Sequence, residues 1–200
     1  MKLKWLVLVF LITSFVKAQD VPEKAEDISP LLIGEKIPNA VLLDPSGNKV
    51  NLNKLIKKKP TILVFYRGGW CPYCNQQLAS LASAEKDIIN LGYQIIAISP
   101  DDFSVLKPVI DENEVNYLLF SDANAKLIQD IGIGFKTPGM AKIFISKRTK
   151  LDASEVLPVP TVMVINTSGE ILFEYMNPNY KKRIGEDLLL SVLKSLKTEL

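Results

Sequence analysis

The chain has 200 residues, of which 48% are hydrophobic, enough for one globular domain with an apolar core. Its formal net charge is only +2, and the charged residues are scattered along the chain, so composition does not indicate a nucleic-acid partner. The sequence contains no histidine and two cysteines. These counts exclude Ser-His and Cys-His catalytic pairs and leave too few ligands for a typical zinc site. We therefore expect neither a metal nor another cofactor.

The first residues have the layout of a secretory signal peptide. Lys2 and Lys4 precede an apolar run over 5–16, and Ala18 offers a small residue at a cleavage point. The run is about 12 residues long, shorter than the ~20 residues that a membrane-spanning helix needs. We expect residues 1–18 to be removed on secretion across the inner membrane into the periplasm, with an uncleaved membrane anchor as the alternative.

Beyond this signal, residues 19–33 are polar and predict a flexible leader before one domain over 34–200. Residue patterns in that domain predict, in chain order, a hairpin over 41–52, a buried strand over 61–66, a helix over Pro72–Asn90, a strand over Gln94–Ser99, a helix opening at Asp101, a strand over Leu118–Ser121, a helix over 125–131, an irregular stretch over 132–157, a strand over Thr161–Ile165, a strand over 171–175 and a helix from Ile184. Strands that alternate with helices predict an α/β fold. We expect a central mixed sheet with helices on both faces and an N-terminal β-hairpin.

A cysteine pair lies where the buried strand gives way to the first long helix, in the sequence Trp-Cys-Pro-Tyr-Cys at 70–74. The spacing of Cys71 and Cys74 places both sulfurs on the first helical turn, within disulfide reach. Free N–H groups and the helix dipole stabilise a thiolate there. Pro72 suits this turn because its missing N–H would have no helical partner. Since a disulfide closing so short a loop adds little stability, the pattern predicts a redox-active pair, with an inert disulfide as the alternative.

Five nearby or later residues are candidates for supporting roles at this pair. Arg67 ends the strand, where it either stabilises a thiolate or covers the strand end as a surface charge. Trp70 and Tyr73 are expected to form an apolar rim beside the sulfurs, with core packing as the alternative. Pro160 marks the start of a strand, and Arg183 precedes the last helix, where a surface or capping role is the default.

Four stretches, at 37–43, 64–74, 98–101 and 119–122, resemble the peroxiredoxin-like branch of the alkyl hydroperoxide reductase/thiol-specific antioxidant (AhpC/TSA) family. The resemblance extends over about residues 34–197. It implies a thioredoxin-like fold and an antioxidant, thiol-based oxidoreductase activity.

The cysteine motif nevertheless departs from that of true peroxiredoxins. In the alignment that the resemblance implies, the peroxidatic cysteine falls on Cys74, the threonine before it on Cys71, the proline on Arg67 and the distant arginine near Pro160. Cys-Pro-Tyr-Cys is instead the glutaredoxin-type active-site sequence. Pro160 also matches the position where thioredoxin-like proteins carry a cis-proline, which would leave backbone groups free to dock an extended substrate. The strand before the motif lacks the buried acid that thioredoxins have there.

The leading hypothesis is dithiol–disulfide exchange. In this hypothesis Cys71 attacks a protein or small-molecule disulfide, Cys74 resolves the mixed disulfide, and an external thiol system restores the dithiol. The alternative is a thiol peroxidase in which a peroxide oxidises Cys74, Cys71 resolves the product, and Arg67 or Arg183 replaces the missing arginine. A third possibility is a non-catalytic binding module with a static disulfide.

Overall fold

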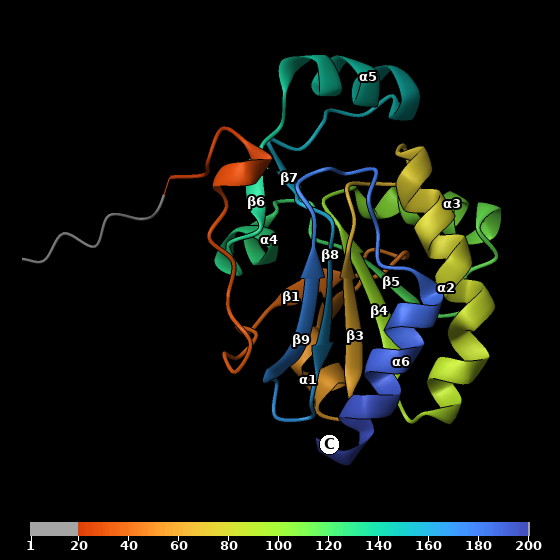
Figure 1. Ribbon diagram of the computed structural model, residues 1–200. Coiled ribbons are helices and arrows are strands. Elements are labelled where there is room, and N and C mark those ends of the chain that lie inside the picture. Colours follow the sequence, from red (N-terminus) through yellow and green to blue (C-terminus); the bar gives the residue numbers. More distant parts are fainter. Residues whose placement is uncertain (1–19, 200) are drawn as a thin grey trace, which may run out of the picture.

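A seven-stranded mixed sheet runs through the centre of the molecule in the computed structural model, which describes residues 20–199 (Figure 1). Its strands lie in the order β2-β1-β5-β4-β3-β8-β9. Their bounds are Val41–Leu43 (β1), Lys49–Asn51 (β2), Thr61–Phe65 (β3), Gln94–Ser99 (β4), Leu118–Ser121 (β5), Thr161–Ile165 (β8) and Ile171–Met176 (β9). β3, β4 and β5 are parallel, whereas the β1–β2 hairpin and the β8–β9 pair join antiparallel. The expected signal peptide over 1–18 lies outside the described residues.

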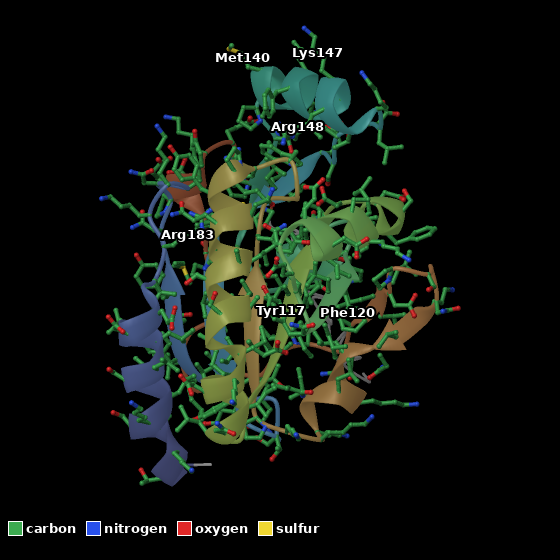
Figure 2. All side chains as sticks on the ribbon, turned by 90° about the vertical axis from the view of Figure 1, so that its right-hand side faces the viewer. Tyr117, Phe120, Met140, Lys147, Arg148 and Arg183 are labelled. Carbon is green, nitrogen blue, oxygen red and sulfur yellow. The ribbon has the colours of Figure 1, made fainter. Side chains whose placement is uncertain are left out.

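The core consists of two apolar layers, one on each face of this sheet, because successive strand residues point to opposite faces. In β3, Ile62 and Val64 belong to one layer and Leu63 to the other, and all three are fully buried. Figure 2 shows the same division for Tyr117, which lies on the first face, and Phe120, which lies on the second.

Helices cover both layers, as the alternation of elements predicts. The first layer lies under α2 (Pro72–Asn90), α3 (Leu106–Glu112) and α6 (Glu186–Leu196), and Figure 1 shows α2 and α6 side by side on that face. The second layer takes side chains from α1 (Leu52–Ile56) and α4 (Lys126–Asp130). The predicted fold class is therefore confirmed.

The long helix α2 begins at Pro72 and ends at Asn90, the bounds that the sequence predicts. Cys71 is its N-cap residue, with an extended backbone at φ −95° and ψ 114°. The buried side of the helix includes Leu78, Leu81 and Ile88, at helical spacing. Because β3 ends at Phe65, the cysteine motif projects from the carboxyl edge of the sheet.

Residues 132–157 contain regular elements where the sequence predicts an irregular stretch. β6 (Gly134–Lys136) pairs antiparallel with β7 (Val156–Pro158), and α5 (Gly139–Thr149) lies between them in the chain. Figure 1 shows α5 above the carboxyl edge of the central sheet. In Figure 2 Met140 and Lys147 extend from α5 away from the sheet, whereas Arg148 lies on the side of α5 that faces the rest of the molecule. Three-residue strands and a helix with polar and apolar residues mixed on its sides leave no periodic pattern to detect.

Residues 20–33, which the sequence predicts to be a flexible leader, are held against the domain. The Ser29 N–H donates to the Gly132 carbonyl at 3.2 Å, and the Leu31 N–H donates to the Ile131 carbonyl at 3.1 Å. Apolar side chains of the segment pack against the two core layers; these are Val21, Ala25, Ile28 and Leu31. The sequence did not indicate that this segment packs against the domain, because only these four apolar side chains make the contact within a mostly polar stretch.

Gly132→Ala should weaken the packing of residues 20–33 against the domain. The loss of stability should exceed the cost of placing an alanine at positive φ. Gly132 has φ +72°, and an added Cβ would lie 1.9 Å from the Ser29 carbonyl oxygen. Gly92→Ala is the matched control, because Gly92 has φ +98° but open space around it. Positive φ costs about 1–2 kcal/mol for either alanine, and the loss of two hydrogen bonds near Gly132 adds about 2 kcal/mol.

The measurement is urea unfolding together with hydrogen exchange of the Ser29 and Leu31 amides. We expect fast exchange of both amides in Gly132→Ala and unchanged exchange in Gly92→Ala. Equal stability and equal exchange in the two variants would show that the segment does not depend on this contact.

Candidate active site

The loop between β3 and α2 is held by Asp101, which lies in the turn after the neighbouring strand β4. Gly68 has φ +137°, a conformation that favours glycine, and an added Cβ would lie 2.3 Å from Trp70 Nε1 and 2.5 Å from Asp101 Oδ1. The Gly69 N–H donates to Asp101 Oδ2 at 2.8 Å. The missing side chain at Gly68 thus lets an indole and a carboxylate lie close together directly before Cys71.

The two cysteines are free thiols and lie almost completely inside the protein. The exposed fractions are 1% for Cys71 and 0% for Cys74. A hydrogen bond from the Cys74 thiol is the main cause that lowers the pKa of Cys71 from 9.0 to about 6, against the opposing effect of burial. The Cys74 N–H and the charges of Arg67 and Arg183 lower it further. Cys71 is therefore mostly a thiolate at neutral pH.

Cys74 has the opposite character. Burial raises its pKa well above the usual value, and the hydrogen bond and charge of Cys71 raise it further. The Arg183 guanidinium, with Nη2 at 3.6 Å from the Cys74 sulfur, acts against these effects. The pair therefore shares one proton, which stays on Cys74 while Cys71 carries the negative charge.

Arg183 lies at the cysteine pair, whereas its position in the sequence predicts a surface or capping role by default. Figure 2 shows it beside α2. Its Nε donates to Gln77 Oε1 at 2.9 Å, and its Nη1 donates to the carbonyl oxygens of Tyr180 and Lys182. These bonds fix the guanidinium, so that its remaining nitrogen faces Cys74.

Arg67 is only 8% exposed and does not act as a surface charge. Its guanidinium carbon lies 4.9 Å from the centre of the Trp70 ring and 4.3 Å from that of Tyr180, within cation–π distance. The charge of Arg67 contributes to the lowered pKa of Cys71. Of the two roles that the sequence left open, this geometry favours support of a thiolate.

The two aromatic residues of the motif differ in their surroundings. Trp70 is buried and contacts Phe144 of α5 edge to face, with ring centres 6.1 Å apart. Tyr73 is 37% exposed and contacts Tyr180, with ring centres 5.8 Å apart. Pro72 is exposed at the start of α2. Tyr73 thus lies at a rim, whereas Trp70 packs between the loop and α5.

Pro160 does not have the predicted cis bond, because no peptide bond among residues 20–199 is cis. The backbone before it is also not free to dock a substrate. The Val159 N–H donates to the Ile133 carbonyl at 2.8 Å, and the Thr161 hydroxyl donates to the Val159 carbonyl at 2.8 Å. Pro160 does lie near the site, since it lines a hollow of about 290 Å³ together with Arg67.

A buried acid that the sequence did not identify as part of the site is Asp101. Burial raises its pKa to about 6, although hydrogen bonds from Gly69 and Ser99 oppose this shift. The acid that is missing from β3 is thus supplied by the turn that follows the neighbouring strand β4. The available signal was its position directly after β4, because the carboxyl ends of adjacent parallel strands meet at one edge of a sheet.

The part of the chain that the structure describes contains no group of three or more cysteine or acidic side chains that could hold a metal ion. Within the same residues, no helix has both the length and the apolar character to cross a membrane. The positive charges of Arg67 and Arg183 lower the pKa of Cys71, and the charge of Arg183 also lowers the pKa of Cys74.

Replacing Cys74 with alanine should raise the pKa of Cys71 toward 9.0, because the variant lacks the main hydrogen-bond donor to its sulfur. Each pKa unit changes the thiolate fraction about tenfold below the pKa, so alkylation of Cys71 by iodoacetamide at pH 6–7 should slow accordingly. Cys74→Ser is the control, since its hydroxyl remains a donor and should preserve part of the shift. Identical pH midpoints for the alanine variant and the parent would contradict this explanation.

Comparison with known proteins agrees with this geometry. Residues 33–173 match the model of the AhpC/TSA family. The chain is 30% identical over 110 residues to chloroplastic peroxiredoxin Q of Suaeda salsa, covering 55% of this chain and 51% of that protein. It is 27% identical over 139 residues to the thiol-disulfide oxidoreductase ResA of Bacillus subtilis, covering 70% of this chain and 64% of ResA. The chain thus spans about half to two thirds of these two relatives.

Solved structures support the same fold. The crystal structure of reduced Prx3 from Vibrio vulnificus superimposes with a TM-score of 0.70 at 17% identity, covering 82% of this chain and 99% of Prx3. The solved structure shows the fold, whereas the relatives by sequence include both a peroxiredoxin and a thiol-disulfide oxidoreductase. The chain belongs to the AhpC/TSA family, and its class of chemistry is that of a thiol-based oxidoreductase.

Proposed function

We propose that the chain catalyses dithiol–disulfide exchange, with Cys71 as the attacking thiolate and Cys74 as the resolving thiol. The observation that carries this proposal is the asymmetry of the pair: the pKa of Cys71 is lowered to about 6, and that of Cys74 is raised. A thiolate is the reactive form of cysteine, so Cys71 is ready to attack at neutral pH. The substrate is a protein or small-molecule disulfide.

In the first step, the Cys71 sulfur bonds to one sulfur of the substrate disulfide, and the other substrate sulfur leaves as a thiolate. In the second step, the Cys74 sulfur bonds to Cys71 and the remaining substrate sulfur leaves. The substrate gains two electrons, and the protein is left with a Cys71–Cys74 disulfide. An external thiol reductant returns the two electrons.

A thiol peroxidase is the second candidate function. Similarity to peroxiredoxin Q favours it, as does the Arg183 nitrogen at 3.6 Å from the Cys74 sulfur, which can stabilise a Cys74 thiolate. Peroxide would oxidise Cys74 to a sulfenic acid, and Cys71 would then form the disulfide and release water. The raised pKa of Cys74 favours exchange over this alternative, because Cys71 and not Cys74 is the sulfur that is ionised at neutral pH.

We also propose that the protein acts after secretion, in the periplasm. The lysines, apolar run and Ala18 of the first 18 residues support this location, and an oxidising compartment permits a cysteine pair to cycle through a disulfide. Mass spectrometry of protein from the periplasmic fraction should find a chain that begins at Gln19. A full-length chain in the membrane fraction would indicate an uncleaved anchor instead.

Cys74→Ala should trap a mixed disulfide with substrate on Cys71, because the thiol that resolves it is missing. Cys71→Ala should trap none, since Cys74 keeps its proton at neutral pH. The measurement is non-reducing electrophoresis and mass spectrometry after incubation with a disulfide-bonded protein. A non-catalytic module would form no adduct in either variant.

Peroxide treatment separates the two catalytic candidates. If exchange is the function, Cys71→Ser and Cys74→Ser should both consume hydrogen peroxide slowly, without a long-lived sulfenic acid on Cys74. If Cys74→Ser alone abolishes sulfenic-acid formation while Cys71→Ser retains it, the assignment of Cys71 as nucleophile is wrong. Dimedone labelling with mass spectrometry identifies the oxidised residue.

A further inference from the structure

The guanidinium group of Arg67 is buried without an anionic partner. The side chain is only 8% exposed, and its Nε has no hydrogen-bond partner among residues 20–199. No ion pair within the same residues includes Arg67. Burying a charge is costly unless the charge is paired and hydrogen-bonded. An unsatisfied buried donor of this kind calls for an explanation, and an anion that binds from outside the protein is one.

Two aromatic rings hold the guanidinium in place. Its carbon lies 4.9 Å from the centre of the Trp70 ring and 4.3 Å from that of the Tyr180 ring. The Trp70 ring is itself packed against Phe144, and the Tyr180 ring against Tyr73. Cation–π contacts stabilise the positive charge but supply no acceptor oxygen. The planar set of N–H donors is therefore positioned but not used up.

Arg67 lines the hollow of about 290 Å³ described above. Most other side chains around this hollow are apolar or aromatic; these are Ala25, Phe135, Pro138, Pro160, Pro178 and Tyr180. Apolar walls with a small number of fixed polar groups are typical of sites that bind small chemical groups. The hollow therefore fits a short carbon chain that ends in a negative charge.

The other charged residues around the hollow do not cancel the charge of Arg67. Glu23, Lys24 and Glu26 line it as well, and all three are exposed. Glu23 forms an ion pair with Lys136, and Lys24 and Glu26 have opposite signs. Salt screens exposed charges more than buried ones. The buried Arg67 therefore determines the sign of the group that the hollow favours, which is negative.

The hollow adjoins the cysteine pair. Arg67 lies four positions before Cys71 in the chain, and its charge acts on the Cys71 sulfur. On the other side, the Tyr180 carbonyl accepts a hydrogen bond from Arg183, which contacts the Cys74 sulfur. When Cys71 bonds to a substrate sulfur, its negative charge passes to the departing thiolate. Arg67 then has no anion near it unless the substrate supplies one.

We propose that the hollow at Arg67 binds a carboxylate of the substrate, carried by the half of the disulfide that bonds to Cys71. The inference rests on the exchange function proposed above. The guanidinium donates two parallel N–H bonds to the two carboxylate oxygens, a geometry that suits arginine better than lysine. The carboxylate replaces the charge that Cys71 loses and so stabilises the mixed disulfide. The substrate class is a disulfide with a carboxylate a few bonds from its sulfur, on a small molecule or on an acidic residue beside a protein disulfide.

The rate at which small disulfides of different charge oxidise the reduced protein tests this site. The probes are 3,3′-dithiodipropionate, which is anionic, bis(2-hydroxyethyl) disulfide, which is neutral, and cystamine, which is cationic. Samples are quenched with acid at pH 8 and analysed by mass spectrometry, and each rate is divided by that of the same probe with dithiothreitol. Because hydrogen bonds to charged groups are strong, we expect the anionic probe to react roughly tenfold faster than the neutral one and cystamine to be slowest. A preference below about twofold in the parent protein would refute the site.

Arg67→Gln should bring the preference for the anionic probe close to one. The variant also raises the pKa of Cys71, but a smaller thiolate fraction slows all three probes equally and leaves their ratio unchanged. Lys181→Gln is the matched control, because it removes one exposed positive charge 6.0 Å from the Tyr180 ring centre and outside the hollow. It should keep the preference within about twofold. Equal losses in the two variants would show general attraction of anions and overturn the assignment to Arg67.

Arg67→Lys is a second variant, which keeps the charge and the long apolar stem if Arg67→Gln fails to fold. Its single ammonium group cannot form the paired hydrogen bonds, so it should keep only part of the preference. The full preference of the parent in this variant would contradict paired binding by the guanidinium.

Two short peptides, each closed by one disulfide with Asp or Asn beside a cysteine, distinguish the two sources of the carboxylate. Faster reaction of the Asp peptide supports an acidic protein segment as the source, and a preference confined to 3,3′-dithiodipropionate supports a small molecule. A parent protein that reacts with no disulfide at all would refute the exchange function itself, on which this inference rests.

Discussion

The hydrogen bond from the Cys74 thiol to the Cys71 sulfur determines which of the two cysteines is ionised and which keeps its proton. It is the main reason that the pKa of Cys71 falls to about 6, and together with burial it keeps the proton on Cys74. The bond requires both sulfurs on one helical turn, which the N-cap and first turn of α2 provide. The reactive sulfur is thus stabilised by its own partner in the reaction, and that stabilisation is lost once Cys71 bonds to a substrate. The change then favours ionisation of Cys74, because the negative charge next to it has disappeared.

The fold brings distant segments of the chain to this pair. The parallel ends of β3 and β4 place Asp101 against the loop before Cys71. The segment between β9 and α6 brings Arg183 to the other sulfur. Arg183 lowers the pKa of both sulfurs, so the difference between the two thiols comes mainly from the hydrogen bond that lowers the pKa of Cys71 and from the burial that raises the pKa of Cys74.

Features that depend on local sequence could be predicted, and those that depend on distant contacts could not. The bounds of α2 followed from helical spacing and from Pro72, and the redox pair followed from its place after a buried strand. Strands β6 and β7 have three residues each and pair with one another across α5, so neither leaves a local pattern. The contact of Arg183 with Cys74 joins residues 109 positions apart. Pro160 was assigned a cis bond by resemblance alone, whereas the hydrogen bonds of Val159 tie this segment to the rest of the fold.

The position of Trp70 has a consequence for how the protein can be observed. The sequence contains two tryptophans, and one of them, Trp5, lies in the segment that we propose is cleaved on secretion. The mature chain would then carry a single indole, next in sequence to Cys71, under the Arg67 guanidinium and against Phe144 of α5. Its fluorescence would come from one defined place in the molecule. The oxidation state of the cysteine pair would then be visible in the emission of the unlabelled protein, without an attached dye.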